Sequence, residues 1–338
     1  MKILSIESSC DETAVAIIED GRHILANQVY TQIAIHRKYG GVVPEIASRN
    51  HVMKMPFVVQ DALDEAHLAF QDIDAIAVTK GPGLVGALLV GVSEAKALAY
   101  ALDKPLIGVN HIEGHIAANY LAFPELEPPF LALVVSGGHT NLVIVKDYGL
   151  NVILGRTRDD AAGEAFDKVA RVLGYPYPGG PAIDKAAQNG DEHAVEFPRA
   201  MLEDGSYDFS FSGLKSAVLN EINHNKMKGI DFRKEDIAAS FQAAVLDVLT
   251  DKTVRCAEEN HVKKIVLAGG VSANKGLRKR MSQVGKKHGW QLYYPPLSLC
   301  TDNAAMIGAR AYYDYQLGRT SDWHLNAMPG LELPGVVK

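Results

Sequence analysis

The chain has 338 residues, of which 47% are hydrophobic and 22% are charged, and its formal net charge is −6 at pH 7. This length exceeds what one hydrophobic core usually organises, so we expect two domains, and the composition excludes a disordered or fibrous chain. The longest apolar run, Leu84 to Val92, is shorter than the about 20 residues that span a membrane, which predicts a buried helix and no membrane partner.

The N-terminal residues and the cysteines predict a cytoplasmic protein. Residues 1–12, MKILSIESSCDE, carry one lysine and then acids, without the apolar core of a secretion signal. Cys10, Cys256 and Cys300 form no CxxC pair and leave one thiol unpaired, as is typical of a reducing compartment.

The first half of the chain predicts strands and helices in alternation. Residues 2–19 predict two strands around a turn rich in Ser and Asp. A strand over 73–80, a Gly-Pro-Gly turn, a helix over 85–102 and a strand over 105–109 follow.

The second half repeats this order. Residues 130–145 predict a similar hairpin around Ser136 to Thr140, which indicates an internal duplication. A strand over 264–268, a Gly269-Gly270 turn and a helix over 272–289 follow, and such strand-turn-helix units indicate an α/β fold.

The predicted domains are residues 1–125 and residues 126–338. The second contains a helical insertion over about 159–235, where Gly, Pro and charged residues are frequent. Each domain opens on a hairpin whose turn could hold phosphate oxygens. Two such lobes indicate, by analogy, the actin-like (ASKHA) fold of actin, sugar kinases and chaperone ATPases, built from duplicated ribonuclease-H-like domains.

The segment Asn110 to His115 predicts a pair of metal ligands. With Asn110 as helix N-cap, His111 and His115 stand at positions i and i+4 and can bind one ion, although two polar histidines without a metal are an alternative. In the HExxH motif of metalloproteases, Glu directly follows the first His. Glu113 instead lies about 200° around the helix from His111. A protease would therefore lack its general base here.

A third metal ligand is expected from Asp302, in the segment CTDNAAMIGA that begins a helix of small residues. The alternative role for Asp302 is to cap that helix. Two histidines and one carboxylate suit Zn²⁺ or Fe²⁺ better than Mg²⁺ and leave coordination positions open.

Three turns are candidates for holding a nucleotide. Ser8 to Thr13 and Ser136 to Thr140 offer hydroxyls and backbone N–H groups. Gly269 to Asn274 lets a flat base approach the backbone before a helix N-terminus. Asp167 and Asp184 could accept ribose hydroxyls, or they could be surface caps.

A basic run lies between Val262 and Trp290, with eight Lys or Arg and no Asp or Glu. Such a run is either a face that binds nucleic acid or a solvated helix surface.

With these motifs the chain resembles the TsaD family, tRNA adenosine threonylcarbamoyltransferases once described as glycoprotein endopeptidases. The resemblance runs from Ile3 to about Tyr315 and rests on SIESSCDETAVAI, YGGVVPEIASRNH, GPGLVGALLVG, HIEGH, LVVSGGHTNL, DDAAGEAFDKVARVLG, YPGGPAID, FSFSGLK, LAGGVSANKGLR and CTDNAAMIG. It implies transfer of threonylcarbamoyl from L-threonylcarbamoyladenylate to N6 of adenosine 37 in tRNAs that read ANN codons, with release of AMP. It also implies a TsaB-like subunit and a TsaE-like ATPase as partners.

The resemblance further implies the site residues. His111, His115 and Asp302 would hold one divalent metal, Fe²⁺ or Zn²⁺. The adenylate would be bound by residues of the turns and the insertion, namely Val134, Val135, Ser136, Gly137, Gly138, Asp167, Gly180, Asp184 and Asn274.

Within this resemblance we expect the adenosine amine to attack the activated donor directly, with no covalent enzyme intermediate. Asp11 is the candidate that orients the amine or a second ion. The basic run is interpreted as a tRNA surface with Lys275, Arg278, Lys279 and Arg280, and the GPGLVGALLVG helix as the TsaB interface. The competing functions are a metalloprotease and a nucleotide-binding chaperone-like module.

Overall fold

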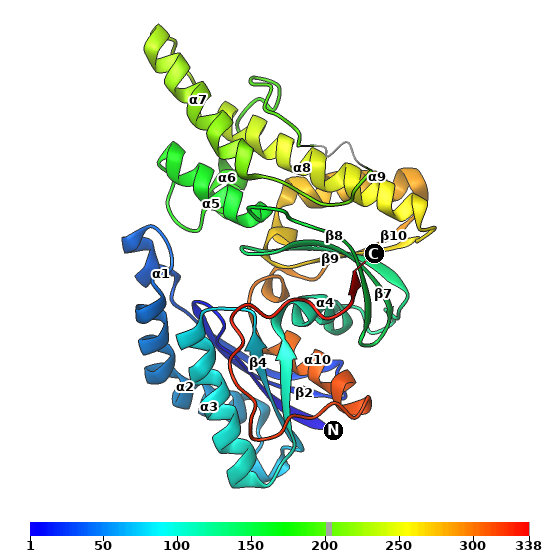
Figure 1. The fold of residues 1–338 in the computed structure, drawn as a ribbon. Coiled ribbons are helices and arrows are strands. Elements are labelled where there is room, and N and C mark those ends of the chain that lie inside the picture. Colours follow the sequence, from blue (N-terminus) through cyan, green and yellow to red (C-terminus); the bar gives the residue numbers. More distant parts are fainter. Residues whose placement is uncertain (201–204, 338) are drawn as a thin grey trace. The chain divides into compact units, whose positions relative to one another are not determined.

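The computed structural model describes residues 1–200 and 205–337, which form two compact units (Figure 1). Unit 1 comprises Met1–Pro128, Asp147–Leu150 and Pro295–Gly335, and unit 2 comprises Pro129–Lys146, Asn151–Tyr294 and Val336–Lys338. The sequence was expected to divide once, between residues 125 and 126. In this division residues 295–335 pack with the N-terminal unit, because they contain a helix that lies on its sheet.

The sheet of unit 1 combines the predicted hairpin with two later strands. Its strands are β1 (Lys2–Glu7), β2 (Glu12–Glu19), β3 (His23–Thr31), β4 (Ala75–Gly81) and β5 (Leu106–Asn110). They lie in the order β3-β2-β1-β4-β5, with β1, β2 and β3 antiparallel and β1, β4 and β5 parallel. β3 was not predicted, because it is a half-exposed edge strand without a regular apolar pattern.

Helices cover both faces of this sheet. Those in contact with its strands are α2 (Pro44–Ala66), α3 (Val85–Leu102), α4 (His111–Ala122) and α10 (Ala304–Gln316), and unit 1 also contains α1 (Ile33–His36), η1 (Arg37–Tyr39), η2 (Phe70–Asp72) and η4 (Leu297–Leu299). From α2 and α3, Met55 and Val92 share a core with Leu4 of β1. On the other face, Ile307 of α10 shares a core with Ile3. Neighbouring residues of β1 thus face opposite cores, which explains why Ile3 and Leu4 are both apolar.

The sheet of unit 2 repeats this strand order. Its strands are β6 (Phe130–Val135), β7 (Thr140–Asp147), β8 (Leu150–Arg156), β9 (Lys264–Ala268), β10 (Gln291–Tyr293) and β11 (Val336–Val337). The order β8-β7-β6-β9-β10 corresponds to β3-β2-β1-β4-β5, and β11 adds to the edge beside β8. As in unit 1, the central strand pairs antiparallel on one side and parallel on the other. This repetition confirms the duplication predicted from the two hairpins.

The helices of unit 2 include the expected insertion. They are α5 (Ala162–Leu173), α6 (Gly179–Ala187), α7 (Ser212–Lys228), α8 (Lys234–Glu259), η3 (Gly270–Ala273) and α9 (Lys275–His288). The segment over 159–235 contains α5, α6 and α7, so helices dominate its described residues. Phe166 and Phe241, from α5 and α8, meet edge to face at 5.3 Å in the core. α8 was not predicted, because it is buried on several sides and lacks an amphipathic pattern.

Among the described residues, α3 is long and apolar enough to cross a membrane by length and composition alone. It packs on α2 and β4, and Ala87, Gly91 and Ala95 are buried there. Val85 and Leu89 are exposed. The helix that was predicted to be buried is therefore buried on one side only.

Candidate metal centre and nucleotide-binding turns

Helix α4 begins at the first predicted metal ligand. Its N-cap is Asn110, as predicted, and Asn110 Oδ1 accepts hydrogen bonds from Ile112 N (2.9 Å) and Glu113 N (3.3 Å). These bonds fix the first turn, so His111 and His115 project from the same side of the helix. Their rings lie edge to face with centroids 4.7 Å apart.

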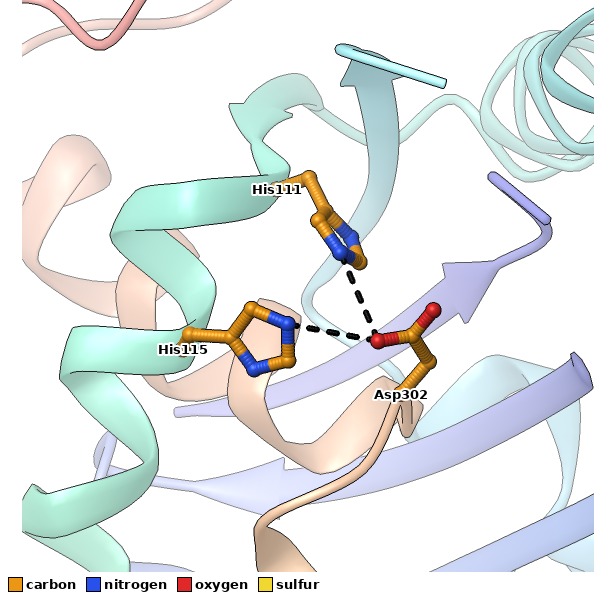
Figure 2. A group of neighbouring side chains, drawn as sticks. All are labelled: His111, His115 and Asp302. Atoms are coloured by element: carbon orange, nitrogen blue, oxygen red, sulfur yellow. Dashed lines mark ion pairs between the residues drawn. The ribbon is translucent and has the colours of Figure 1, made fainter. Parts of the chain in front are cut away.

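Asp302 forms a cluster with the two histidines (Figure 2). Its Oδ1 lies 3.4 Å from His111 Nε2 and 3.2 Å from His115 Nε2. The cap of α10 is Asn303, whose Oδ1 accepts a hydrogen bond from Met306 N at 3.1 Å. The carboxylate of Asp302 is therefore left to face the histidines, and the capping role considered for it belongs to its neighbour.

The chemistry of this cluster fits a transition-metal ion. One ligand atom from each of the three residues lies within 4.8 Å of the others. His115 is 1% exposed, its Nδ1 has no hydrogen-bond partner in the described part of the chain, and its Nε2 faces the Asp302 carboxylate without forming a well-aligned hydrogen bond. Buried polar atoms rarely stay without a partner. Two imidazoles and a carboxylate are ligands that Zn²⁺ and Fe²⁺ accept, and three protein ligands leave room for a substrate.

The charges of Asp302 and the histidines shift one another's pKa values in opposite directions. Burial alone would raise the pKa of Asp302, but His111 and His115 outweigh burial and hold that pKa well below its usual range. Burial would likewise lower the pKa of His111, yet Asp302 and Glu7 raise it well above its usual value. Because a ligating imidazole must be neutral, a metal ion would displace a proton from this group.

Glu113 is directed to a different partner. Its Oε1 lies 3.3 Å from Arg310 Nη2 of α10, and both side chains are buried. The helical spacing predicted that this carboxylate points away from His111, and the ion pair with Arg310 confirms it. The position that the metalloprotease mechanism requires for its general base is therefore not filled from this motif.

Glu7, the last residue of β1, adjoins the cluster and was missed by the sequence reasoning. Its Oε2 lies 2.9 Å from His111 Nδ1 and accepts a hydrogen bond from Thr79 Oγ1 at 2.6 Å. Its Oε1 accepts one from Ser9 N at 2.5 Å. An acidic residue at the end of a buried apolar strand is uncommon, so this position could have marked Glu7 as a candidate site residue. Its partner His111 is 104 residues away, so the contact itself has no local pattern.

The turn between β1 and β2 carries Asp11, the candidate for orienting the amine. Asp11 is buried, and its carbonyl oxygen accepts a hydrogen bond from Gln32 N at 2.9 Å. The Cys10 carbonyl oxygen lies 2.9 Å from His51 Nε2 of α2, so α2 holds this turn. Burial, with a contribution from Asp11, raises the pKa of the Cys10 thiol well above its usual value. This thiol is therefore not an activated nucleophile.

The turn between β6 and β7 closes on itself. Ser136 N donates to His139 O at 2.8 Å, and His139 N donates to Ser136 Oγ at 3.2 Å. Val134–Val135 is fully buried in β6. At Gly137–Gly138 an added Cβ would meet no described atom within 4 Å, so the backbone is open there to a ligand.

The predicted residues of α5 and α6 also lie in unit 2. Asp167 Oδ1 accepts a hydrogen bond from Gly179 N at 2.6 Å, which places it beside Gly180. Asp184 Oδ2 faces Lys275 N at 3.4 Å, at the start of α9. Asp184 Oδ1 is buried and has no hydrogen-bond partner among the described residues, so it is available to a ligand hydroxyl.

Asn274 is the N-cap of α9. Its Oδ1 accepts a hydrogen bond from Leu277 N at 2.9 Å, and its Nδ2 donates to Gln242 Oε1 at 2.7 Å. Gln242 was not predicted. Gly269 has φ +86°, and a Cβ there would lie 2.4 Å from Val135 O, so glycine is needed for this turn to approach β6.

A pocket of about 950 Å³ lies between α6, α8 and α9 in unit 2. Asp184, Lys275 and Lys279 are among its lining residues. Within the part of the chain that the structure describes, Lys275 and Lys279 form no ion pair. Their charges are free to meet an anion.

Arg278 and Arg280, the other cations expected to contact tRNA, are engaged within unit 2. Arg278 Nε donates a hydrogen bond to Ser272 O at 2.7 Å. Arg280 forms ion pairs with Asp247 and with Glu192, the latter at 2.9 Å. Both guanidinium groups therefore stabilise the local fold, and the charge of Arg280 is partly neutralised by its two acidic partners.

Solved structures share this fold. Full-length HypF in its phosphate- and nucleotide-bound form superposes with a TM-score of 0.62 and 16% identity, covering 95% of this chain and 47% of HypF. The activator of 2-hydroxyisocaproyl-CoA dehydratase from Clostridium difficile, with bound ADPNP, gives a TM-score of 0.54 and 15% identity over 95% of this chain and 99% of that one. Together with the repeated strand order, they confirm the predicted actin-like fold class.

Sequence relatives are much closer. The TsaD family model, described as tRNA N6-adenosine threonylcarbamoyltransferase, matches residues 23–309. Proteins of that name from Clostridioides difficile (strain 630) and Clostridium novyi (strain NT) are each 58% identical, over 330 and 334 residues, and the match covers 98% of every chain involved. The chain therefore belongs to the TsaD family of tRNA N6-adenosine threonylcarbamoyltransferases, as its motifs predicted.

Proposed function

We propose that this chain transfers the threonylcarbamoyl group of L-threonylcarbamoyladenylate to N6 of adenosine 37 in tRNAs that read ANN codons, and releases AMP. The observation that carries the proposal is the cluster of buried His111 and His115 with half-buried Asp302 in a chain of the TsaD family. The family name supplies tRNA adenosine as the acceptor, and the ligand set supports a metal-dependent reaction.

The reaction needs positioning more than a strong nucleophile, because the donor is already a mixed anhydride. The N6 lone pair attacks the carbamoyl carbon and forms the new C–N bond. The bond from that carbon to the phosphate oxygen breaks, AMP leaves with the electron pair, and a proton of N6 passes to water. Asp11 is proposed to orient the attacking amine. The raised pKa of Cys10 supports transfer without a thiol intermediate.

His111, His115 and Asp302 are proposed to hold one divalent ion, Fe²⁺ or Zn²⁺. Such an ion would stabilise negative charge on the carbonyl or carboxylate oxygens of the donor. Asn110 contributes by fixing the first turn of α4, and with it the direction of both imidazoles.

The adenylate is proposed to bind in unit 2, at Val134 to Gly138, Asp167, Gly180, Asp184 and Asn274. Two observations support this assignment. Asp184 Oδ1 is buried and without a hydrogen-bond partner among the described residues, so a ribose hydroxyl could donate to it. At Gly137, Gly138 and Gly180 the backbone is open, so a flat or charged ligand group can approach it.

For tRNA, we propose phosphate contacts from Lys275 and Lys279, whose charges are not used within the described fold. Arg278 and Arg280 would then shape this surface more than bind the phosphates. A tRNA substrate is consistent with the expected cytoplasmic location.

The TsaB-like partner is proposed to dock on the exposed side of α3. Val85 and Leu89 are exposed there, and α2, which packs against α3, exposes Met53 and Phe57. Exposed apolar side chains on neighbouring helices are typical of protein interfaces. A TsaE-like ATPase is proposed as the further partner.

The test is reconstitution with labelled threonine, bicarbonate, ATP, the enzyme that makes the donor, the partner subunits and unmodified tRNA. The expected result is label in the anticodon loop and release of AMP. A tRNA with guanosine at position 37 is the matched control and should stay unlabelled. If the adenosine 37 tRNA also stays unlabelled while the donor is made, the proposed function is wrong. A labelled enzyme on the way to product in single-turnover quenching would contradict direct attack.

A further inference from the structure

We propose that Glu7 is a positioning residue that orients His111 for metal binding and fixes which nitrogen of its ring carries the proton. This inference rests on the metal site of the proposed function. It concerns residues of unit 1 only.

Glu7 is held in place beside His111 by burial and by hydrogen bonds to both of its carboxylate oxygens. Its side chain is fully buried, and both carboxylate oxygens are used. Oε1 accepts from Ser9 N, while Oε2 accepts from Thr79 Oγ1 and faces His111 Nδ1 at 2.9 Å. A buried carboxylate is costly unless its oxygens find such partners, so this arrangement stabilises a charged group at one defined place.

The pairing determines the tautomer of His111. An ionised carboxylate only accepts hydrogen bonds, so Nδ1 of His111 must carry the proton that points to Glu7. Ser9 Oγ, 3.3 Å from the same Nδ1, can accept as well. Nε2 is then left without a proton once the ring is neutral, and this is the atom that faces Asp302 at 3.4 Å. A carboxylate behind the ring thus directs a lone pair toward the metal position.

The second histidine has no equivalent support. His115 Nδ1 lacks a hydrogen-bond partner among the described residues, whereas His111 Nδ1 faces both Glu7 and Ser9. The two imidazoles are therefore not equivalent ligands. His111 is held from behind by Glu7, whereas His115 faces Asp302 through Nε2 and has no hydrogen-bond partner at Nδ1 among the described residues.

Glu7→Gln is the sharpest variant because its shape is nearly unchanged. The glutamine amide has one oxygen that can accept hydrogen bonds. In the wild type, however, Ser9 N donates to one carboxylate oxygen, and Thr79 Oγ1 and His111 Nδ1 face the other. If the oxygen faces Ser9, the NH₂ group meets His111 and forces Nδ1 to accept, which places the proton on Nε2. If the oxygen faces His111, the NH₂ group opposes Ser9 N. Either arrangement weakens the alignment of the ligand.

The matched control is Asp314→Asn, the same change at another buried carboxylate of unit 1. Asp314 pairs with Arg310 Nη2 at 2.7 Å on α10 and does not belong to the metal cluster. Asp314→Asn therefore measures the effect on the fold of losing a buried charge outside the metal cluster. Thr79→Val is the reserve variant if Glu7→Gln does not fold, because it removes one donor to Glu7 and leaves the carboxylate in place.

The experiment titrates the metal-free full chain with Zn²⁺ alone by calorimetry and records ¹⁵N-histidine spectra of the Zn²⁺-loaded proteins. Glu7→Gln should bind Zn²⁺ roughly 10–100-fold more weakly than the wild type. Thr79→Val should show a smaller loss, and Asp314→Asn none. The wild-type spectrum should show one histidine with the proton on Nδ1 and the metal on Nε2, and this signal should be lost in Glu7→Gln.

Unchanged Zn²⁺ affinity in Glu7→Gln would overturn the proposal, as would an equal loss in Asp314→Asn. A wild type that binds no Zn²⁺ would overturn it together with the metal part of the proposed function. If Zn²⁺ binding responds to Glu7 as expected but reconstitution gives no labelled tRNA, the proposed transfer reaction fails and the role of Glu7 stands.

Discussion

The carboxylate of Asp302 lies 3.2 Å from His115 Nε2, while the adjacent Asn303 caps α10. Asn303 thus stabilises the helix, while the adjacent Asp302 is proposed to bind the metal. Asn303→Ala should lower the free energy of unfolding by about 1 kcal/mol, since Met306 N loses its acceptor, and should retain the metal. Asp302→Asn should lose the metal. Urea denaturation and metal analysis of the purified proteins measure both. Metal retained in Asp302→Asn would contradict the assignment of this ligand.

Gln242 should affect adenylate binding through Asn274. In Gln242→Met the buried Nδ2 of Asn274 loses its acceptor, which should cost about 1–3 kcal/mol of stability and weaken AMP binding. Calorimetry with AMP and urea denaturation test these effects. Gln60→Met, the same change on the exposed side of α2, should change neither quantity. Unaltered AMP affinity in Gln242→Met would show that Asn274 does not need this partner.

Two adjacent cations of α9 should have separable roles. Lys279→Ala should weaken tRNA binding and reduce the salt dependence of log K by about one contact, because Lys279 has no ion pair in the described chain. Arg280→Ala should lower stability by about 0.2–1 kcal/mol through loss of the Asp247 and Glu192 pairs, with a smaller effect on tRNA. Filter binding at several salt concentrations, with urea denaturation, distinguishes them. Equal tRNA losses would assign Arg280 to the tRNA surface as well.

His51 should make stability depend on pH. Burial lowers the pKa of His51 below its usual 6.5, and the ring lies between Thr13 Oγ1 and Cys10 O. Between the folded pKa and 6.5, His51 is therefore protonated in the unfolded chain but neutral in the folded chain. The contribution of His51 to stability is complete above pH 6.5 and is lost as pH falls through the lower folded pKa. Urea midpoints measured from about pH 5 to pH 8 should fall less steeply toward acid pH in His51→Gln than in the wild type. Parallel curves would remove His51 as the cause.

Features that depend on residues close together in the chain could be predicted from the sequence. Asn110, His111 and His115 follow from helix periodicity and capping, and the two hairpins gave the duplicated sheets. Asp302 was a weaker inference from residues alone, because a cap and a ligand use the same side chain at a helix start. The structure assigns the cap of α10 to Asn303, and the ligand role of Asp302 stays a prediction.

The residues that the sequence missed depend on partners far along the chain. Glu7, Gln242 and His51 act through contacts with His111, Asn274 and Cys10, and none of these contacts has a periodic signature. The basic run shows the same limit. A count of Lys and Arg in α9 does not reveal that Asp247 of α8 and Glu192 neutralise Arg280.

The return of residues 295–335 to unit 1 has a consequence for biosynthesis. During translation His111 and His115 leave the ribosome long before Asp302, so the proposed ligand set is complete only when almost the whole chain has been made. Until then the sheet face that α10 covers is exposed. In the complete chain, Ser5 Oγ of this sheet donates a hydrogen bond to Ala304 O of α10, 299 residues away. A nascent or truncated chain that ends before Pro295 would therefore expose this apolar face, where chaperones or aggregation would compete with folding.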